Sequence, residues 1–502
     1  MSTPIHLIAP EHLTLDGVVM WYACRQPQRA VLEPYNQQPV TWEWLGRAVQ
    51  GTAESIASKI QRASVIGIVC EDSVGFHVLV NALWRCGASV LLISRTWGAS
   101  VVKDLLKLTG ITMLYCNDAN YLSNEDKEWL RPFPAIQLSA VPLSPSTTNI
   151  NDVAMFATTS GTTDNPKCVA IRHRQIRTAY RSALAVHDFS HVRRAASLFP
   201  LNGIGVMGVC FLLPREVGAA TRIYPPFSLA NIQHSWQNIL TKDVDFVYLV
   251  PPLVRMLGVL RLPLLTRKSP LLAFCASAPV TQSELRLLEE RFPVRIYNSY
   301  GLTELTFAVF FGCRDEYDAA SDSIGYPIGI EARLESPNGK TLLGSAEGEL
   351  LLKGPMMTEG YLNNPKATQA MWAGEWLRTG DLAKRDAAGR YFICGRIKDV
   401  VIRGGVTTYL YELEHYLRRV PHVIDAAAFK GRDLPSGDEL CAVVHMSKPM
   451  QPEEILAWIR EHVGPEKSPN ILFVWDQELP RNSNGKVMRM QLSNMRLSGE
   501  LG

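Results

Sequence analysis

A short polar segment that ends in a lysine offers the clearest chemistry in this sequence. Residues 154–158 are typical of the end of a β-strand, and they run into the loop Thr158-Thr159-Ser160-Gly161-Thr162-Thr163-Asp164-Asn165-Pro166-Lys167. Closely spaced backbone N–H groups, hydroxyls and one cation are the groups that hold a polyphosphate. The P-loop motif needs glycine before its lysine and serine or threonine after it, and Pro166 and Cys168 stand there instead. The loop therefore predicts phosphate binding without the P-loop motif.

The loop resembles the phosphate-binding signature of the adenylate-forming superfamily, which includes acyl-CoA synthetases, aryl-acid ligases, stand-alone adenylation domains of peptide synthetases and luciferases. The resemblance implies that Lys167 and the residues before it bind the phosphates of ATP: Thr159, Ser160, Gly161, Thr162 and Thr163. Two positions depart from the family, which usually has glycine where Asp164 and Cys168 stand. A carboxylate at Asp164 weakens phosphate binding unless its side chain turns outward or caps the next turn.

A second segment, Asn298-Ser299-Tyr300-Gly301-Leu302-Thr303-Glu304, resembles the family's Tyr-Gly-x-Thr-Glu motif. Tyr300 offers an aromatic face to adenine, and Gly301 permits close approach of the backbone. Thr303 can hydrogen-bond a phosphate oxygen, and Glu304 is a hard oxygen ligand suited to Mg²⁺. The resemblance implies that Asn298 and Ser299 also lie at the nucleotide.

Upstream of this motif, Ala276-Ser277-Ala278-Pro279 resembles the family's Gly-Ala-Pro loop. In the family that loop lies along the adenine and the acyl pocket. Taken locally, the segment is at least as well explained as a simple turn before a helix at 282–291.

Two more matches follow, in the order that the family has. Trp376-Leu377-Arg378-Thr379-Gly380-Asp381 resembles the Thr-Gly-Asp motif, in which the carboxylate of Asp381 accepts hydrogen bonds from both ribose hydroxyls. In the segment Gly395-Arg396-Ile397-Lys398-Asp399, the resemblance implies that Arg396 contacts the ribose or a phosphate. Lys398 falls where the family has the hinge between its two domains.

The last match runs from Leu479 to Arg489 and resembles the family's C-terminal lysine loop. Gly485 favours a tight turn that presents Lys486, the residue expected to stabilise the transition state of adenylation as a point charge. The resemblance also implies that Gly404 and Gly405 flank a tunnel for the pantetheine arm of the thiol substrate. The position of Leu410 departs from the family, which usually has proline there.

The implied reaction has two steps. A carboxylate attacks the α-phosphorus of ATP and releases pyrophosphate, with Lys486, Mg²⁺ held through Glu304 and the phosphate loop stabilising the negative charge. A thiol then attacks the acyl-adenylate after the C-terminal domain has rotated about Lys398. No covalent protein nucleophile is needed.

The acid itself is weakly specified. Residues 198–205 lack the aspartate with which relatives that activate amino acids pair the α-ammonium group, and they also lack the histidine of acyl- and aryl-CoA ligases. We therefore expect a small or medium hydrophobic or aromatic acid without an α-amino group. The expected pocket residues are Asn202, Met207, Tyr248, Ser277 and Ser299.

Three classes of function stay open at this point. An acid–thiol ligase that forms acyl-CoA is favoured by Gly404-Gly405 followed by Glu412-Leu413-Glu414. Because no carrier-protein domain follows Arg489, the thiol is expected in trans, as CoA or on a separate acyl or peptidyl carrier protein. The alternatives are a stand-alone adenylation enzyme that loads such a carrier protein, and a non-catalytic relative that binds nucleotide.

The elements that position these motifs alternate in a regular way. Apolar runs at 63–70, 88–94, 111–115, 246–250, 271–275 and 294–298 are separated by segments of helical spacing, which predicts parallel sheets with crossover helices. From about residue 325, short strand-like runs predict a small antiparallel or barrel-like module. The sequence thus predicts an α/β fold: a large N-terminal domain at 1–397 and a small, mobile α+β C-terminal domain at 398–502.

The bulk composition agrees with this organisation. A chain of 502 residues is too long for one hydrophobic core. Its net charge of +3, from 51 basic and 48 acidic residues, gives no reason to expect nucleic-acid or membrane binding. Ten scattered cysteines, no secretory signal and no convincing membrane span predict a cytoplasmic protein with reduced thiols and no structural zinc.

Overall fold

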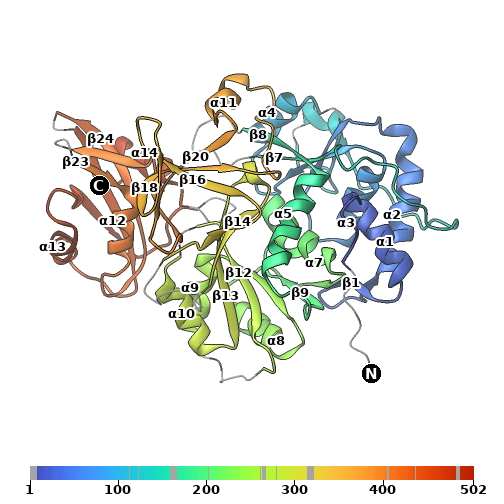
Figure 1. Ribbon diagram of the computed structural model, residues 1–502, viewed down its shortest axis with the longest axis horizontal. Coiled ribbons are helices and arrows are strands. Elements are labelled where there is room, and N and C mark those ends of the chain that lie inside the picture. Colours follow the sequence, from blue (N-terminus) through green and yellow to red (C-terminus); the bar gives the residue numbers. More distant parts are fainter. Residues whose placement is uncertain are drawn as a thin grey trace. The chain divides into compact units, whose positions relative to one another are not determined.

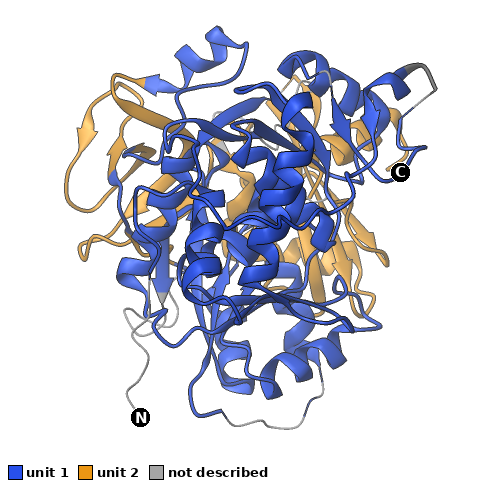
Figure 2. Cartoon of the chain, turned by 90° about the vertical axis from the view of Figure 1, so that its right-hand side faces the viewer, with its two compact units in different colours: residues 1–322, 327–331, 353–372 blue, residues 323–326, 332–352, 373–502 orange. Residues whose placement is uncertain are grey.

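The computed structural model describes residues 8–111, 113–122, 124–158, 167–201, 203–260, 262, 267–278, 280–313, 322–403, 406–435, 437–481 and 487–501. The chain divides into two compact units, coloured blue and orange in Figure 2. Unit 1 comprises residues 1–322, 327–331 and 353–372, and unit 2 comprises residues 323–326, 332–352 and 373–502.

One of the sheets in unit 1 carries the stems of the phosphate loop. Its strand order is β6-β5-β3-β4-β7-β8, and its last two strands, β7 and β8, are labelled in Figure 1. Its strands are β3 (Val65–Val69), β4 (Ser89–Ile93), β5 (Leu114–Tyr115), β6 (Leu130–Arg131), β7 (Val153–Thr158) and β8 (Cys168–Arg172). All neighbours are parallel except β7 and β8. Every residue of β4 is buried, as expected for a strand that is covered on both faces.

The other sheet of unit 1 has the order β15-β14-β13-β12-β11-β9-β10-β1-β2. Its strands are β1 (Ala30–Pro34), β2 (Val40–Thr41), β9 (Arg194–Ser197), β10 (Ala220–Ile223), β11 (Phe246–Leu249), β12 (Leu271–Cys275), β13 (Val294–Gly301), β14 (Ala308–Cys313) and β15 (Tyr326–Pro327). The strands from β13 to β1 are parallel to their neighbours, whereas β14 is antiparallel to β13 and β2 is antiparallel to β1. The predicted parallel sheets are therefore present.

Some helices of unit 1 begin at a residue whose side chain caps the first turn. Ser73 caps α3 by accepting a hydrogen bond from the backbone N–H of Phe76 at 3.1 Å, and Thr281 forms a capping box with Glu284 at the start of α10. The helices are α1 (Leu15–Arg25), α2 (Trp42–Ile56), η1 (Ala57–Lys59), α3 (Val74–Arg85), α4 (Ala99–Thr109), η2 (Asn124–Trp129), α5 (His173–Val186), α6 (Ile204–Val206), the π-helix η3 (Met207–Leu212), α7 (Leu213–Glu216), α8 (Ile232–Thr241), α9 (Pro251–Val259), α10 (Gln282–Arg291), η4 (Thr303–Leu305) and α11 (Pro365–Ala370).

A buried ion pair ties the N-terminal segment to this core. The guanidinium of Arg177, on α5, lies 2.7 Å from a carboxylate oxygen of Glu216, and both side chains are at most 2% exposed. Arg177 also donates to the carbonyl oxygens of Ala9, Pro10 and Leu13. Removing one partner of a buried pair typically costs about 3–5 kcal/mol, because the other charge is left uncompensated.

Unit 2 contains the small module and the C-terminal α+β part. The first sheet has the order β17-β16-β18-β20-β19, with β21 paired to β20, and the second has the order β23-β22-β25-β24, with β26 paired to β25. The strands are β16 (Glu331–Glu335), β17 (Thr341–Leu342), β18 (Ala346–Lys353), β19 (Trp372–Ala373), β20 (Trp376–Arg385), β21 (Tyr391–Arg396), β22 (Val400–Arg403), β23 (Val406–Tyr409), β24 (Val423–Leu434), β25 (Gly437–Met446) and β26 (Ile471–Trp475). The helices are α12 (Leu410–Leu417), α13 (Pro452–Val463) and α14 (Arg489–Ser498).

The compact units do not share the boundary that the sequence predicts. The antiparallel module is grouped with the C-terminal residues in unit 2, whereas the predicted domains meet between residues 397 and 398. The predicted boundary concerns which part moves, and it stays a prediction. Within the described ranges, no helix combines the length and the apolar character needed to cross a bilayer.

Candidate active site

The carboxyl ends of three parallel strands bring part of the predicted acid pocket together. Leu249 of β11 pairs with Cys275 of β12, and Cys275 pairs with Asn298 of β13. The residues at this edge therefore include Tyr248, Ser277 and Ser299. The carboxyl edge of a parallel sheet is where α/β proteins commonly bind ligands.

Tyr248 and Ser277 form the polar contact of this edge. Their hydroxyl oxygens are 2.6 Å apart, and burial raises the pKa of the Tyr248 phenol. Ser277 has a positive φ of 81°, a conformation that costs a non-glycine residue of order 1–3 kcal/mol and recurs at functional sites. No pattern in the sequence predicts this positive φ. Ala278 follows Ser277, and the predicted Pro279 lies outside the described residues.

Of the remaining predicted pocket residues, the structure describes Met207 and Ser299 but not Asn202. Met207 is fully buried at the start of the π-helix η3, a helix type that is frequent at functional sites. Ser299 is 6% exposed, and its hydroxyl donates to the carbonyl oxygen of Tyr297 at 3.1 Å. Asn202 lies outside the described residues.

The predicted nucleotide motif forms the turn between β13 and β14. Tyr300 packs edge-to-face on Phe310, with ring centroids 5.8 Å apart. A Cβ atom at Gly301 would lie 2.3 Å from the carbonyl oxygen of Phe307. Glycine is therefore required here by the crossing of the turn itself, which is a stronger constraint than the ligand approach that the sequence suggested. The turn leads directly into Thr303, which begins η4.

Two predicted catalytic residues of unit 1 converge on one tyrosine. The hydroxyl of Tyr361 donates to Oε1 of Glu304 at 2.6 Å, and Nζ of Lys167 lies 4.8 Å from the centroid of the Tyr361 ring. Lys167 directly precedes β8, so it stands at the exit of the predicted phosphate loop. The sequence analysis did not find this role of Tyr361, because no spacing rule links residues so far apart along the chain.

A magnesium ion fits this place only with help from a substrate. The described residues contain no group of three or more His, Cys, Asp or Glu side chains that could hold a metal. Glu304 is one carboxylate, and its partner Tyr361 is a hydroxyl and not a second charged group. Mg²⁺ is often held by one or two carboxylates together with phosphate oxygens of a nucleotide. The donor set therefore suits a magnesium–nucleotide complex better than a free ion.

The phosphate loop itself lies outside the described residues, and so do its predicted ligands Thr159, Ser160, Gly161, Thr162 and Thr163 and the departure at Asp164. Its stems are described: Thr158 and Cys168 are antiparallel partners at the ends of β7 and β8. The Cys168 side chain is fully buried in an apolar cluster with Leu91 and Phe156, and burial raises the pKa of its thiol to about 12. This departure from the family is thus accommodated in the core as a neutral side chain.

The two nucleotide contacts predicted in unit 2 form a pair. Asp381 of β20 and Arg396 of β21 are register partners, and the guanidinium Nε of Arg396 lies 3.0 Å from Oδ1 of Asp381. The Asp381 side chain is 4% exposed, whereas that of Arg396 is 46% exposed. Lys398 is exposed in the connection between β21 and β22. This location is compatible with a hinge, which stays a prediction.

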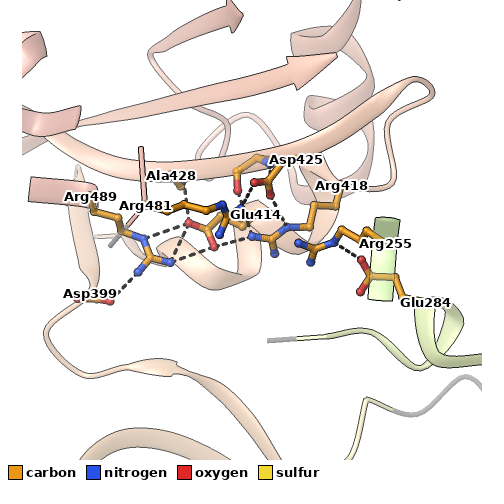
Figure 3. A network of polar contacts seen from close by, with 10 residues as sticks. Arg255, Glu284, Asp399, Glu414, Arg418, Asp425, Ala428, Arg481 and Arg489 are labelled. Carbon is orange, nitrogen blue, oxygen red and sulfur yellow. Dashed lines mark hydrogen bonds and ion pairs between the residues drawn. The ribbon is translucent and has the colours of Figure 1, made fainter. Parts of the chain in front are cut away.

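Lys486, Gly404 and Gly405 lie outside the described residues, but both stems of the lysine loop are described. Arg481 forms a β-bridge with Val487. On α14, Arg489 donates to both carboxylate oxygens of Glu414 at 2.9–3.1 Å and to Asp399 at 3.2 Å (Figure 3).

Glu414 is the centre of this network. Its carboxylate is 2% exposed and also accepts hydrogen bonds from the backbone N–H of Ala428 at 3.0 Å and from Arg418 at 3.2 Å. Asp425 in turn pairs with Arg418 and Arg481. The network therefore fixes both stems of the lysine loop to α12 and β24.

Comparison with known proteins identifies the family of the chain. The family model described as AMP-binding enzyme matches residues 20–362, and the model described as AMP-binding enzyme C-terminal domain matches residues 412–486. A sulfoacetate–CoA ligase of Cupriavidus necator is 30% identical over 442 residues, which cover 86% of this chain and 82% of that protein. An oxalate–CoA ligase of Arabidopsis thaliana is 27% identical over 501 residues, which cover 95% of this chain and 97% of that protein.

Solved structures of similar fold confirm the predicted fold class. The anthranilate CoA ligase AuaEII, solved with anthranoyl-AMP, has a TM-score of 0.84 at 19% identity over 98% of this chain and 99% of that chain. The o-succinylbenzoate CoA synthetase MenE of Bacillus subtilis, solved with ATP and magnesium ion, has a TM-score of 0.83 at 23% identity over 95% of this chain and 99% of that chain. At such identities the likeness establishes the fold, while the match over residues 20–362 establishes the family. The chain belongs to the family of AMP-binding enzymes.

Proposed function

We propose that this protein activates a carboxylic acid with ATP, forms an acyl-adenylate with release of pyrophosphate, and transfers the acyl group to the thiol of CoA. The observation that carries the proposal is the convergence of Lys167 and Glu304 on Tyr361 within an AMP-binding enzyme fold. It joins the cation of the phosphate loop to a carboxylate suited to magnesium. The relatives with CoA ligase names support CoA as the acceptor.

The proposed chemistry uses the residues that the sequence predicts for the site. A carboxylate oxygen of the acid attacks the α-phosphorus of ATP, and the bond from that phosphorus to the pyrophosphate oxygen breaks. Lys486 and Lys167 offer positive charge to the transition state, and Asp381 accepts hydrogen bonds from the ribose hydroxyls. Mg²⁺ held through Glu304 would draw negative charge from the phosphate oxygens. In the second step the thiol sulfur attacks the acyl carbon, and AMP leaves.

The finer parts of the proposal concern the acid and the moving domain. The contact between Tyr248 and Ser277 supports a small or medium acid whose far end meets a largely apolar pocket with two hydroxyls. Residues 398–502 are proposed to rotate about Lys398 between the two steps. A separate carrier protein is the alternative thiol donor, and the free thiols among the described cysteines support a cytoplasmic location.

Pyrophosphate exchange tests the first step. The full chain is incubated with ATP, magnesium and labelled pyrophosphate over a panel of fatty, aryl, amino, dicarboxylic and sulfonated acids, with and without CoA. We expect exchange with at least one acid and an acyl-CoA product from that acid. Exchange without such a product favours a carrier protein, and no exchange with any acid refutes adenylation.

A lysine variant tests the assignment of Lys486. Lys486→Ala should abolish adenylate formation and leave thiolysis of supplied acyl-adenylate intact. Lys448→Ala, which removes an exposed lysine of the same unit, serves as the control and should leave both steps unchanged. Equal loss of both steps in Lys486→Ala contradicts a role that is confined to the first step.

A further inference from the structure

A short segment of unit 1, residues 358–362, runs alongside the strand that leaves the phosphate loop. The Thr358 hydroxyl donates to the carbonyl oxygen of Ala170 at 3.1 Å, and Tyr361 forms a β-bridge with Val169. The backbone N–H of Leu362 donates to the carbonyl oxygen of Cys168 at 2.7 Å. Three successive contacts therefore hold this segment against β8, immediately beyond Lys167.

The same segment also forms hydrogen bonds with Glu304. The backbone N–H of Thr358 donates to the carbonyl oxygen of Glu304 at 2.8 Å, while the Tyr361 hydroxyl donates to Oε1 of its carboxylate at 2.6 Å. Both the main chain and the side chain of Glu304 are thus fixed by residues 358–361. The carboxylate has little freedom to choose another rotamer without losing the phenol.

The phenol is a neutral donor, and this matters for the charge at the site. Asp381 in unit 2 pairs with a guanidinium, which compensates its charge. Glu304 has instead a hydroxyl on Oε1, which orients the carboxylate without cancelling its charge. A partner that orients a ligand in this way tunes metal affinity, and its removal typically costs about 10- to 100-fold in metal affinity or activity.

The ring of Tyr361 serves the neighbouring cation. Nζ of Lys167 lies 4.8 Å from the ring centroid, within the distance at which a cation is attracted to an aromatic face. The lysine is thereby held close to Glu304 without an ion pair between them being required. Tyr361 therefore contacts both charged groups: its hydroxyl donates to Glu304, and its ring lies beside Lys167.

We propose that Tyr361 is a positioning residue for the magnesium–nucleotide complex, holding the Glu304 carboxylate for the metal and the Lys167 ammonium for the phosphates. The role of Tyr361 in catalysis rests on the proposed function. Its effect on binding can be measured without turnover, because the gain in nucleotide affinity that magnesium provides should depend on the hydroxyl of Tyr361.

Nucleotide binding tests this directly. The full chain is titrated by calorimetry with α,β-methylene-ATP, which cannot release pyrophosphate, once with saturating magnesium and once with EDTA. Tyr361→Phe keeps the ring near Lys167 and removes only the hydroxyl. We expect it to lose about 10- to 100-fold of the affinity in magnesium and none in EDTA. Tyr361→Leu should weaken binding in EDTA as well, because it also removes the aromatic face.

A matched control guards against a general structural effect. Tyr224→Phe removes a phenol that donates to Oδ1 of Asn238 at 3.2 Å, within the same unit but away from Glu304 and Lys167. It should bind as the wild type does in both buffers. Equal affinities of Tyr361→Phe and wild type in magnesium, or equal losses in magnesium and EDTA, overturn the inference. The two proposals can also fail separately. If the wild type shows no pyrophosphate exchange but Tyr361→Phe still loses affinity only in magnesium, the proposed reaction is refuted and the inference about Tyr361 is supported.

Discussion

Replacement of Glu414 by glutamine should loosen α12 and β24, and the structure sets the size of the effect. Breaking a buried ion pair by removing one partner typically costs about 3–5 kcal/mol. Here Arg489 keeps Asp399 at 3.2 Å, Arg418 keeps Asp425 at 3.7 Å, and the new amide oxygen can still accept from the Ala428 backbone. We therefore expect a loss of about 2–3 kcal/mol in Glu414→Gln, below the full cost of an abandoned charge.

The measurement should be local, because a chain with two compact units need not unfold in one step. Hydrogen exchange followed by mass spectrometry on the full chain reports the opening of residues 410–417 and 423–434. A loss of about 2–3 kcal/mol corresponds to about 30- to 140-fold faster exchange of amides that exchange through this opening.

Glu412 supplies a matched control on the same helix. It pairs with Lys467 at 2.8 Å, but both side chains are about one-third exposed. Pairs of this kind contribute about 0–1 kcal/mol, so Glu412→Gln should accelerate exchange by less than about fivefold. Equal acceleration in Glu412→Gln and Glu414→Gln would refute the argument that burial makes the Glu414 network the stronger anchor.

Two further outcomes can be measured on single variants. Gly301→Ala should destabilise the chain by about 1–3 kcal/mol and slow pyrophosphate exchange, because the new methyl meets the carbonyl oxygen of Phe307. Gly98→Ala, with no atom within 4 Å of the added Cβ, should leave thermal unfolding nearly unchanged, and equal shifts would argue against the clash. The guanidinium of Arg496 lowers the pKa of Glu439 from 4.5 to about 2, so the pair stabilises unit 2 above pH 4.5 and this stabilisation is lost as the pH falls towards 2. Glu439→Gln should flatten that part of the stability profile in acid denaturation, and an unchanged profile would contradict the assignment.

Motif order in the sequence was sufficient to predict the family, the fold class and the reaction class, and these predictions are confirmed. The reason is that each motif combines a predicted ligand-binding residue with the neighbouring residues that form its local structure. Asp381 and Arg396 illustrate this, because both lie on strands whose pattern was visible and both were assigned to the nucleotide. Their mutual pairing across β20 and β21 was not predicted, since it depends on the register of two strands.

Other parts of the site depend on contacts that no local pattern contains. Tyr361 meets Glu304 across 57 positions of sequence, and Glu414 meets Arg489 across 75. Such contacts are determined by the tertiary fold. The local sequence indicates only that Tyr361 lies near a turn and Glu414 on a helix. Predictions for the phosphate-loop residues, Asn202 and Lys486 stay predictions, because these residues lie outside the described part of the chain.

The buried pair of Arg177 and Glu216 has a consequence for how the chain is made. Residues 9–13 find their partners only when Arg177 and Glu216 exist, and β1 is flanked by β10, whose last residue is Ile223. At bacterial and eukaryotic synthesis rates, roughly 10–40 s separate the translation of Leu32 from that of Ile223. During this interval strand β10 is absent, and Val31 and Leu32, which are buried in the folded protein, lack this neighbouring strand. The nascent N-terminal segment therefore exposes these apolar side chains until β10 has been synthesised.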